Sequence, residues 1–451
     1  MIQLKNNLSL NQRDDNSYII IDPEQGKYYK LNNSALQIID RLKEKKTIEN
    51  LITDISDHYG VPTSLVREDI EKFVEKLKLS GFIYEEDNVK DIDKRDDTNK
   101  ESLEELKTLW IKVTNKCNLS CHYCYAESGV NAENTDQITL EEIEKLLETA
   151  KPMGLERIVI TGGEPLIRKD ILEIFKLARK FGLVQLLSNG TIYDEKILKQ
   201  IVELVDIIQF SMDSHEKEKH DEIRGAGSFE KTLKSVKYLR SIGFKNIVFA
   251  TTPTPTNNID LRKMIDLCIT NEVRRLHVNR YVPLGRAKDY KNFDIEDFYR
   301  KADEAYFYIS QLYRKSLENK ESFDFAIDIS GDLVESVAAV NKKYSCGLNK
   351  SSASIESNGD VYLCQAMHHK SLVIGNIRNE SFDSIMKKSR EKFGEFNVDS
   401  IDKCKDCDVR YWCAGGCRAL AFAVNGEMRK EDPQCCSHRQ RVLEIMGRVG
   451  T

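Results

Sequence analysis

Three cysteines in one short stretch carry the clearest chemical signal in this chain. Cys117, Cys121 and Cys124 stand in a C-x3-C-x2-C pattern just after the apolar run 109–113. A short loop with this spacing can turn three thiolates toward one centre, and soft sulfur ligands suit an iron–sulfur cluster better than a hard cation. Three protein ligands on a four-iron cluster leave one iron open, and chemistry at a metal needs an open coordination position.

A zinc knuckle and a disulfide loop are the alternatives for these cysteines. Zinc sites usually show two paired ligands followed by a second pair, and no fourth cysteine lies near the loop. The chain has 12 cysteines and no visible secretion signal. This combination indicates metal ligands in a reducing compartment rather than a disulfide scaffold.

A second motif, Gly162-Gly163-Glu164-Pro165, follows the apolar run 158–161. By itself such a turn indicates only a tight change of direction that needs positive φ. Together with the cysteine loop, it resembles the radical S-adenosylmethionine (SAM) superfamily. The resemblance implies that the three cysteines hold a [4Fe–4S] cluster and that SAM chelates the open iron. It also implies that Gly162, Gly163 and Glu164 contact the amino group of SAM.

The same resemblance assigns further residues to SAM binding, namely Tyr123, Ser188, Ser211, Asp213, Arg224 and Val282. Ser211 and Asp213 can hydrogen-bond the ribose hydroxyls of SAM or simply cap the end of a strand. Arg224 matches the place of an arginine that pairs with the SAM carboxylate, a role that suits a planar guanidinium. An exposed arginine at a helix end is the alternative. Val282 is expected to offer backbone contacts to adenine.

The segment 107–320 alternates strand-like apolar runs with amphipathic helices. This order predicts a parallel α/β architecture, and six such units fit a partial (β/α)6 TIM-like barrel, as in the superfamily. Barrel chemistry lies at the C-terminal ends of the strands, where the motifs fall. The expected strands are 110–114, 156–161, 183–187, 206–211, 246–251 and 275–280, and the expected helices are 139–151, 169–181, 194–204, 228–242 and 259–270.

Residues 1–88 are predicted to form a winged-helix-like α+β domain, with strands at 18–22 and 27–31, three helices and a closing strand at 81–84. DNA binding is one use of such a domain, but the acids on its second and third helices would repel phosphates. The domain resembles the peptide-recognition domain of ribosomal-peptide maturases. That resemblance implies that it holds a leader peptide as an added strand, while a structural cap on the core is the alternative. The charged segment 89–106 is typical of a solvated linker.

The range 321–451 is predicted to be a Cys-rich iron–sulfur domain. Its ordered thiols, separated by loops, can hold two further clusters, and the pattern resembles the SPASM domain. The implied ligands of a first auxiliary cluster are Cys346, Cys364 and Cys417, and those of a second are Cys404, Cys407, Cys413 and Cys435. Two structural zinc sites are the alternative.

This chain departs from fuller SPASM domains after Cys346. The following residues contain no cysteine, so the first auxiliary cluster is short of one ligand. A substrate thiolate, a water or a distant protein group can fill that place. Cys436, directly after Cys435, leaves the last ligand of the second cluster open.

Composition limits the partners of the protein. A net charge of -5 and 31% charged residues are those of an ordinary soluble protein, with no basic excess for nucleic acid. No signal peptide is visible, and no apolar run approaches the ~20 residues of a membrane span. We therefore expect a cytoplasmic protein without a nucleic-acid or membrane partner.

The sequence thus predicts a radical SAM oxidoreductase that acts on a peptide. The implied cofactors are three [4Fe–4S] clusters and SAM. The implied partners are a precursor peptide, whose leader binds the N-terminal domain, and an external electron donor of flavodoxin or ferredoxin type. The implied reaction forms an intramolecular thioether in a ribosomally made peptide, as in sactipeptide or ranthipeptide maturation. Carbon–carbon crosslinking, formylglycine formation and an iron–sulfur DNA-binding regulator are the alternatives, and no catalytic base stands out.

Overall fold

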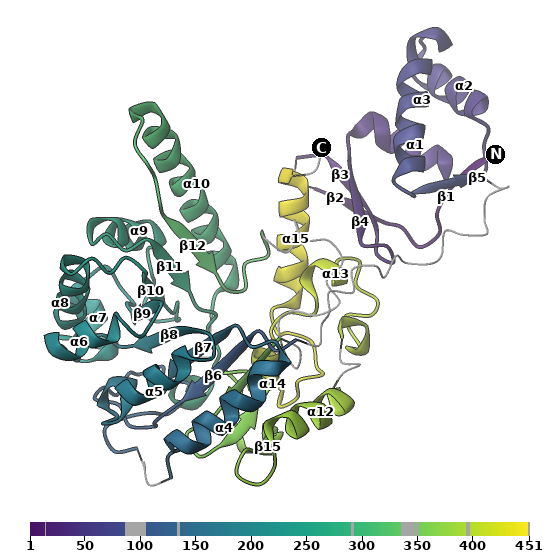
Figure 1. Ribbon diagram of the computed structural model, residues 1–451. Helices are drawn as coiled ribbons and strands as arrows, with labels where there is room; N and C mark the ends of the chain where they lie inside the picture. Colours follow the sequence, from purple (N-terminus) through teal and green to yellow (C-terminus); the bar gives the residue numbers. More distant parts are fainter. Residues whose placement is uncertain are drawn as a thin grey trace.

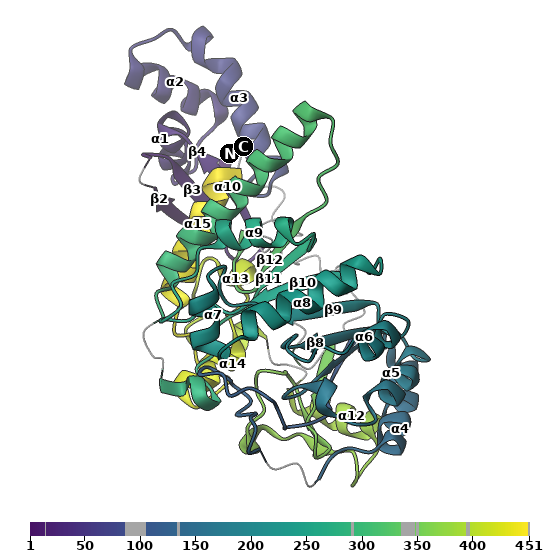
Figure 2. The same cartoon turned by 90° about the vertical axis from the view of Figure 1, so that its left-hand side faces the viewer.

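The computed structural model describes residues 1–13, 15–85, 105–132, 136–289, 293–334, 348, 351–393 and 397–449. Cys346, predicted to ligate the first auxiliary cluster, lies outside the described residues, as does most of the predicted linker. The N-terminal helices form one lobe of the molecule, and the large sheet with its helices forms the other (Figure 1). Helices α13 (Arg410–Cys413) and α15 (Cys435–Val449) lie between the two, whereas α12 (Phe382–Phe393) lies with the large sheet (Figure 2).

A ten-stranded sheet organises the larger lobe, in the order β12-β11-β10-β9-β8-β7-β6-β13-β14-β15. The strands are β6 (Thr108–Lys112), β7 (Arg157–Thr161), β8 (Leu183–Ser188), β9 (Ile207–Ser211), β10 (Ile247–Thr251), β11 (Arg275–Val278), β12 (Ala326–Ile329), β13 (Ser352–Ile355), β14 (Asp360–Tyr362) and β15 (Gly375–Asn376). Every pairing from β12 to β13 is parallel, whereas β14 and β15 are antiparallel. The predicted partial α/β barrel is confirmed, and β6 to β11 lie within two residues of the expected strands.

Two strands extend the barrel beyond the predicted six. β12 joins β11, and β13 joins β6, so each edge of the six-stranded core gains a parallel partner. Both strands lie in the range expected for the C-terminal domain. Their short, weakly apolar sequences, Ala-Ile-Asp-Ile and Ser-Ala-Ser-Ile, give no strong strand signal.

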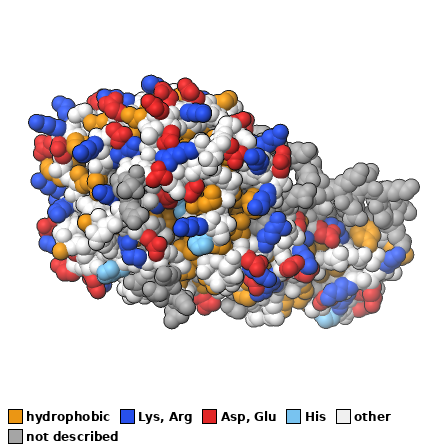
Figure 3. Space-filling model, turned by 90° about the horizontal axis from the view of Figure 1, so that it is seen from below, with side chains coloured by type: hydrophobic (Ala, Val, Ile, Leu, Met, Phe, Trp, Pro, Cys, Tyr) orange, Lys and Arg blue, Asp and Glu red, His pale blue; other side chains and the backbone are white. Residues whose placement is uncertain are grey.

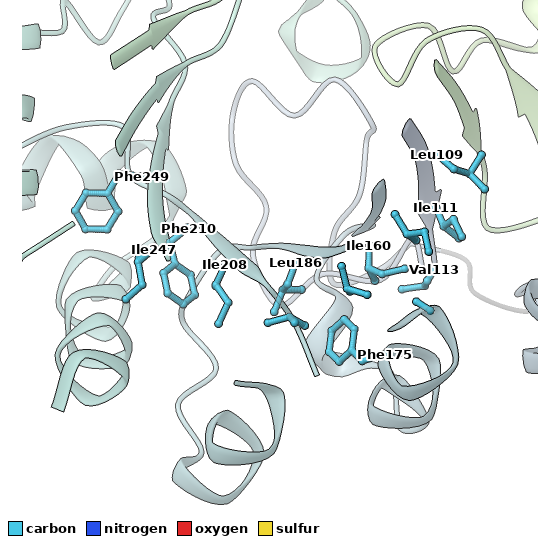
Figure 4. Close-up of a cluster of buried hydrophobic side chains, with 14 of the residues drawn as sticks. Leu109, Ile111, Val113, Ile160, Phe175, Leu186, Ile208, Phe210, Ile247 and Phe249 are labelled. Atoms are coloured by element: carbon cyan, nitrogen blue, oxygen red, sulfur yellow. The ribbon is translucent and has the colours of Figure 1, made fainter. Parts of the chain in front are cut away.

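Helices cover one face of this sheet. They are α4 (Leu140–Ala150), α5 (Ile171–Arg179), α6 (Glu195–Ile201), α7 (Lys217–Arg224), α8 (Ser228–Ser241), α9 (Leu261–Thr270) and α10 (Ile295–Asn319). Alternate strand residues, such as Leu109, Ile111 and Phe210, are fully buried on the helix-facing side (Figure 4). Because successive strand residues point to opposite faces, Lys112, Gln209 and their equivalents point to the inner face of the barrel.

The N-terminal lobe contains β1 (Ile2–Leu4), β2 (Ser9–Gln12), β3 (Tyr18–Asp22), β4 (Lys27–Leu31), α1 (Asn33–Leu42), α2 (Ile48–Tyr59), α3 (Thr63–Leu79) and β5 (Ile83–Glu85). Strands β2, β3 and β4 form one sheet, and β1 pairs with β5. The sequence analysis predicted β3, β4, β5 and three helices but missed β1 and β2. β2 reads Ser-Leu-Asn-Gln, and one apolar residue in four is too little for a strand signal.

The C-terminal segment adds α12 (Phe382–Phe393), α13 (Arg410–Cys413), α14 (Arg418–Asn425) and α15 (Cys435–Val449). The expected loops are therefore accompanied by helices with a core of their own. Ile19 and Ile21 of β3 pack in that core with Trp412 and with Val442 of α15. Ile20, between them, packs instead against the N-terminal helices. The central strand of the small sheet is thus buried on both faces. None of the described helices has the length and apolar character needed to cross a membrane.

Candidate functional site

The cysteine loop follows β6 at the C-terminal end of the barrel strands. The backbone N–H of Cys117 donates to Gly129 O (3.1 Å), and that of Cys124 donates to Cys121 O (3.4 Å). Burial is the main cause of the raised pKa of the Cys117 thiol, and the charges of Cys121 and Cys124 also raise it. The three sulfurs therefore lie close enough to interact electrostatically. The structure therefore brings the three predicted ligands together.

The chemistry of these thiols fits a metal cluster. Burial raises the pKa of the Cys117 thiol to about 11, and a bound metal supplies the positive charge that a thiolate there requires. Within the described ranges, no three Cys, His, Asp or Glu side chains converge closely enough to hold a single metal ion. A cluster binds each thiolate at a different iron, so its ligands stand further apart than those of one ion.

The Gly-Gly turn after β7 is bound directly to the start of the cysteine loop. Gly163 N donates to Thr114 O (2.7 Å), and Glu164 N donates to Lys116 O (2.9 Å). A Cβ at Gly162 would lie 2.6 Å from Thr114 O, and one at Gly163 would overlap Lys116 O. Both positions therefore require glycine, because two backbone segments meet without room for a side chain.

Glu164 is fully buried, and its carboxylate accepts three hydrogen bonds from the protein. The donors are Leu166 N (3.1 Å), Ser188 Oγ (2.9 Å) and Asn189 N (2.7 Å). Burial raises the pKa of Glu164 to about 7, against the lowering effect of these donors. The structure thus joins two predicted SAM contacts, Glu164 and Ser188, at neighbouring strand ends. Their contact with SAM stays a prediction.

Two asparagines that the sequence analysis did not assign lie beside Cys117. Asn189 Nδ2 donates to Asn118 Oδ1 (2.8 Å) and lies 3.8 Å from the Cys117 sulfur. Asn118 Nδ2 in turn donates to Thr191 Oγ1 (2.8 Å), which donates to Asn189 Oδ1 (2.7 Å). This closed network fixes the cysteine loop to the end of β8. The Asn-Gly pair after the third predicted strand was the only sequence signal for it.

Asp213, Tyr123 and Arg224 form a second buried network at the site. The Asp213 carboxylate accepts from Tyr123 OH (2.6 Å), from Thr252 N (3.1 Å) and from Arg224 Nε. The Arg224 side chain also donates to Tyr123 OH (2.5 Å), and its Nη1 lies 4.0 Å from the Cys121 sulfur. Three predicted SAM contacts are thus joined to one predicted cluster ligand. Asp213 holds the guanidinium beside the cysteine loop.

A loop after β11 holds the cysteine loop from another side. Arg286 N donates to Cys124 O (3.0 Å), and Arg286 Nε donates to Cys121 O (2.8 Å). Gly285 has a φ of +59°, and a Cβ there would lie 2.6 Å from Cys124 O. Val282, predicted to contact adenine, lies in the same loop. The sequence analysis expected only adenine contacts from this loop, because an arginine that binds distant backbone carbonyls leaves no local pattern.

The inner face of the barrel carries a His–Asp pair. His277 of β11 and Asp328 of β12 are in register, with Nδ1 and Oδ2 2.8 Å apart. Hydrogen bonding to His277 is the main cause that lowers the pKa of Asp328. Both side chains remain partly exposed, at 24% and 54%. Ser211, another predicted SAM contact, ends β9 on the same face.

Four C-terminal cysteines lie close to one another. Burial is the main cause of the raised pKa of Cys404, and the charges of Cys407 and Cys435 add to it. Burial is also the main cause at Cys413, where the charges of Asp432, Cys404 and Cys407 add to it. Four thiols predicted to hold the second auxiliary cluster are thus electrostatic neighbours. Burial raises the pKa of Cys413 to about 12, so a thiolate there also needs a nearby positive charge. Their ligand roles stay predictions.

Of the two described ligands predicted for the first auxiliary cluster, Cys364 lies near Tyr125, because the charges of Cys124 and Cys364 add to the effect of burial in raising the pKa of Tyr125. Cys417 is not separate from the group of four, because Asp432, which contacts it, also raises the pKa of Cys413. Cys417 precedes α14 and donates its backbone N–H to Asp432. Cys436 is exposed.

Three family models match this chain. The radical SAM superfamily matches residues 111–268, Coenzyme PQQ synthesis protein D (PqqD) matches 17–83, and the SPASM iron–sulfur cluster-binding domain matches 346–408. The chain therefore carries a radical SAM domain, an N-terminal PqqD domain and a C-terminal SPASM domain.

Curated relatives of this chain are named for different activities. An AdoMet-dependent heme synthase of Oleidesulfovibrio alaskensis is 29% identical over 72% of this chain and 85% of its own length. The mycofactocin maturase MftC of Mycobacterium tuberculosis is 26% identical over 72% of this chain and 81% of its own length.

Solved structures share the fold. Streptococcus suis SuiB bound to the precursor peptide SuiA has a TM-score of 0.61 at 18% identity, covering 97% of this chain and 100% of that one. Native anSMEcpe with bound AdoMet has a TM-score of 0.59 at 20% identity, covering 75% and 96%. These likenesses support the arrangement of three domains described above.

Proposed function

We propose that this protein is a radical SAM peptide maturase that forms a thioether between a cysteine sulfur and a carbon of a ribosomally made precursor peptide. The observation that carries the proposal is the joining of the cysteine loop to the Gly-Gly turn at the ends of β6 and β7. When bound, a [4Fe–4S] cluster and SAM supply a carbon-centred radical that removes hydrogen from a substrate. Cys117, Cys121 and Cys124 would hold the cluster.

The residues around the loop would bind and orient SAM. Arg224, held by Asp213 and Tyr123, presents a fixed cation beside Cys121, which suits a carboxylate. Glu164 and Ser188 present oxygen atoms at the adjacent strand ends. Arg286 keeps the loop closed by binding two of its carbonyls.

The proposed reaction removes two hydrogens from the peptide. One leaves the carbon as an atom, and the thiol hydrogen leaves as a proton, so that a C–S bond replaces one C–H and one S–H bond. One surplus electron must then leave the peptide. The C-terminal cysteines are the residues that would hold its acceptor, and an external flavodoxin or ferredoxin would supply the electron that SAM cleavage consumes.

The PqqD domain would bind the leader of the precursor. Because β3 already pairs with a strand on each side, a peptide can join that sheet as an added strand only along an edge, at β2 or β4. SuiB was solved with its precursor peptide, and MftC is named a mycofactocin maturase. The SuiB complex supports a peptide as the substrate.

The test uses short cysteine-containing open reading frames next to the gene, made as peptides. The reconstituted, reduced protein with SAM should lower the mass of one peptide by two hydrogens and remove one thiol that iodoacetamide can alkylate. A Cys→Ala peptide is the control and should not change. The same mass loss in the control would indicate carbon–carbon crosslinking, and an aldehyde product would indicate formylglycine formation.

The heme synthase relatives favour a second candidate, a radical SAM enzyme that acts on a porphyrin. Turnover of an iron porphyrin by the reconstituted full chain, with no peptide modified, would favour the second candidate over the first. Tight duplex DNA binding without SAM cleavage would point to a regulator.

A further inference from the structure

A buried charged network lies where the barrel meets the C-terminal cysteines. Arg280 follows β11, and its Nη2 lies 2.8 Å from His438 Nε2, while its Nη1 lies 3.5 Å from Asp432 Oδ2. Asp432 and His438 are fully buried, and the Arg280 side chain is 17% exposed. A buried cation of this kind needs a carboxylate partner, and Asp432 provides it.

Glycines make room for the two charged groups. Gly331 has a φ of +90°, and a Cβ there would lie 2.7 Å from Arg280 Nε. Gly416 has a φ of +71°, and a Cβ there would overlap the Asp432 carboxylate. At Gly331 and Gly416, two positions far apart in the sequence, the absence of a side chain leaves room for the Arg280–Asp432 ion pair.

His438 fixes the orientation of the guanidinium. Because a guanidinium only donates hydrogen bonds, His438 Nε2 accepts from Arg280, and we assign the ring hydrogen to Nδ1, which contacts Tyr299 OH of α10. Burial lowers the pKa of His438, in keeping with a neutral ring. Arg280 is therefore held by a carboxylate on one side and by an imidazole on the other.

The network reaches Cys417 through Asp432. Asp432 Oδ2, the oxygen nearest Arg280, accepts the backbone N–H of Cys417 at 2.7 Å. Although burial opposes its charge, Cys417 and Asp432 raise the pKa of Arg280 above its usual range. The guanidinium is thus the fixed positive charge beside this thiol.

We propose that Arg280 is a positioning residue for the auxiliary cluster ligated by Cys417, and that its charge raises the reduction potential of that cluster. The proposal rests on the proposed function, since it takes Cys417 as a cluster ligand. Reduction adds negative charge to a cluster, and a nearby cation or a hydrogen bond to a ligand sulfur stabilises the reduced form. An acceptor for the surplus electron of peptide oxidation needs such stabilisation.

The test is a redox titration followed by electron paramagnetic resonance on the reconstituted full chain. Arg280→Gln should lower the midpoint potential of one C-terminal cluster by at least the equivalent of a tenfold change in its reduction equilibrium, which is about 59 mV for one electron. The cluster at Cys117 should keep its potential. Arg280→Lys, which keeps the charge, should shift the potential by less than half as much. Arg300→Gln, on an exposed arginine of α10, should shift none.

Unchanged potentials in a fully loaded Arg280→Gln protein would overturn the proposal, as would equal shifts in the Gln and Lys variants. If Arg280→Gln does not load its clusters, Arg280→Lys decides, and loss of the same cluster from the Lys variant would show that charge is not what the site needs. Iron analysis of Cys417→Ser tests the ligand role of Cys417 separately from the proposed peptide-maturase function. Full iron content there would contradict Cys417 as a ligand, whereas SAM cleavage and peptide modification test the proposed function independently.

Discussion

At the scale of single residues, burial sets the protonation of Glu164. Its carboxylate has no exposure and accepts three protein hydrogen bonds, yet burial dominates and raises its pKa to about 7. A positively charged amino group placed beside it would reverse that effect, since an opposite charge favours the ionised form. The residue is therefore prepared to bind a cation.

The raised pKa of Glu164 predicts a pH dependence of stability in the cluster-free protein. The folded chain holds a proton that the unfolded chain releases above pH 4.5, so this contribution is full below pH 4.5 and is lost as the pH rises through 7. Between pH 4.5 and a pH above 7, the free energy of unfolding of the wild type should fall by on the order of 3 kcal/mol more than that of Glu164→Gln. Urea unfolding of both proteins at pH 4.5 and 8 measures it. Parallel pH profiles would contradict the assignment.

Arg224 should decide SAM affinity. Its guanidinium is fixed by Asp213 next to Cys121, and loss of a charged hydrogen bond costs about 1.5–3 kcal/mol, so Arg224→Ala should raise the Kd for SAM about 10- to 100-fold. Isothermal titration of the reconstituted protein measures the Kd. Arg300→Ala, on an exposed helix face, is the control and should bind like wild type. Equal affinity in the Arg224 variant would remove this residue from the site.

At the scale of elements, backbone contact between neighbouring strand ends positions the site. The turn after β7 hydrogen-bonds the segment after β6 twice, and the loop after β11 binds the same cysteine loop through Arg286. Three strand ends therefore meet around one loop. This is the usual place of an active site in a barrel.

Gly163→Ala should displace the cysteine loop, because the added methyl group would overlap Lys116 O. We expect the variant to lose the cluster at Cys117 while the C-terminal clusters remain, which iron analysis and Mössbauer spectroscopy can measure. Gly243→Ala is the matched control. Its φ is +88° with nothing within 4 Å of the added carbon, so it carries backbone strain of about 1 kcal/mol without a collision. Full iron content in Gly163→Ala would contradict the steric account.

The sequence predicts the strands and the cysteine loop, but not the contacts between distant residues that position the loop. Strands β6 to β11 are apolar runs separated by amphipathic helices, a local pattern, and the three cysteines are defined by their spacing. Asn189 reaches Cys117 across 72 positions and Arg286 reaches Cys121 across 165, so only the fold brings them together. His277 was missed because its partner lies on β12, a strand with little apolar signal.

At the scale of the whole molecule, charge is mixed and the domains are joined. Lys and Arg are interspersed with Asp and Glu over the face seen in Figure 3, in keeping with a net charge of only -5. The PqqD sheet packs on α15 through Ile19 and Ile21, and Ser9 Oγ donates to Asp408 (2.6 Å), next to Cys407. The sheet proposed to bind the leader and the cysteines predicted to hold the second auxiliary cluster thus share one interface.

Ile21→Ala should weaken that interface. The side chain is fully buried against the C-terminal helices, and its truncation should cost about 2–5 kcal/mol of unfolding free energy. Thermal and urea denaturation measure the loss. Leu10→Ala on β2, where the side chain is 39% exposed, should change stability by less than about 0.5 kcal/mol. Similar losses in both variants would argue against a packed interface.

The most direct test of the account is reductive cleavage of SAM at the three-cysteine loop. The anaerobically reconstituted, dithionite-reduced protein should release 5′-deoxyadenosine from SAM. The variant with Cys117, Cys121 and Cys124 all changed to alanine should release none, although it keeps its C-terminal clusters. Absence of 5′-deoxyadenosine from the fully loaded wild type, or equal amounts from the triple variant, would contradict the central claim.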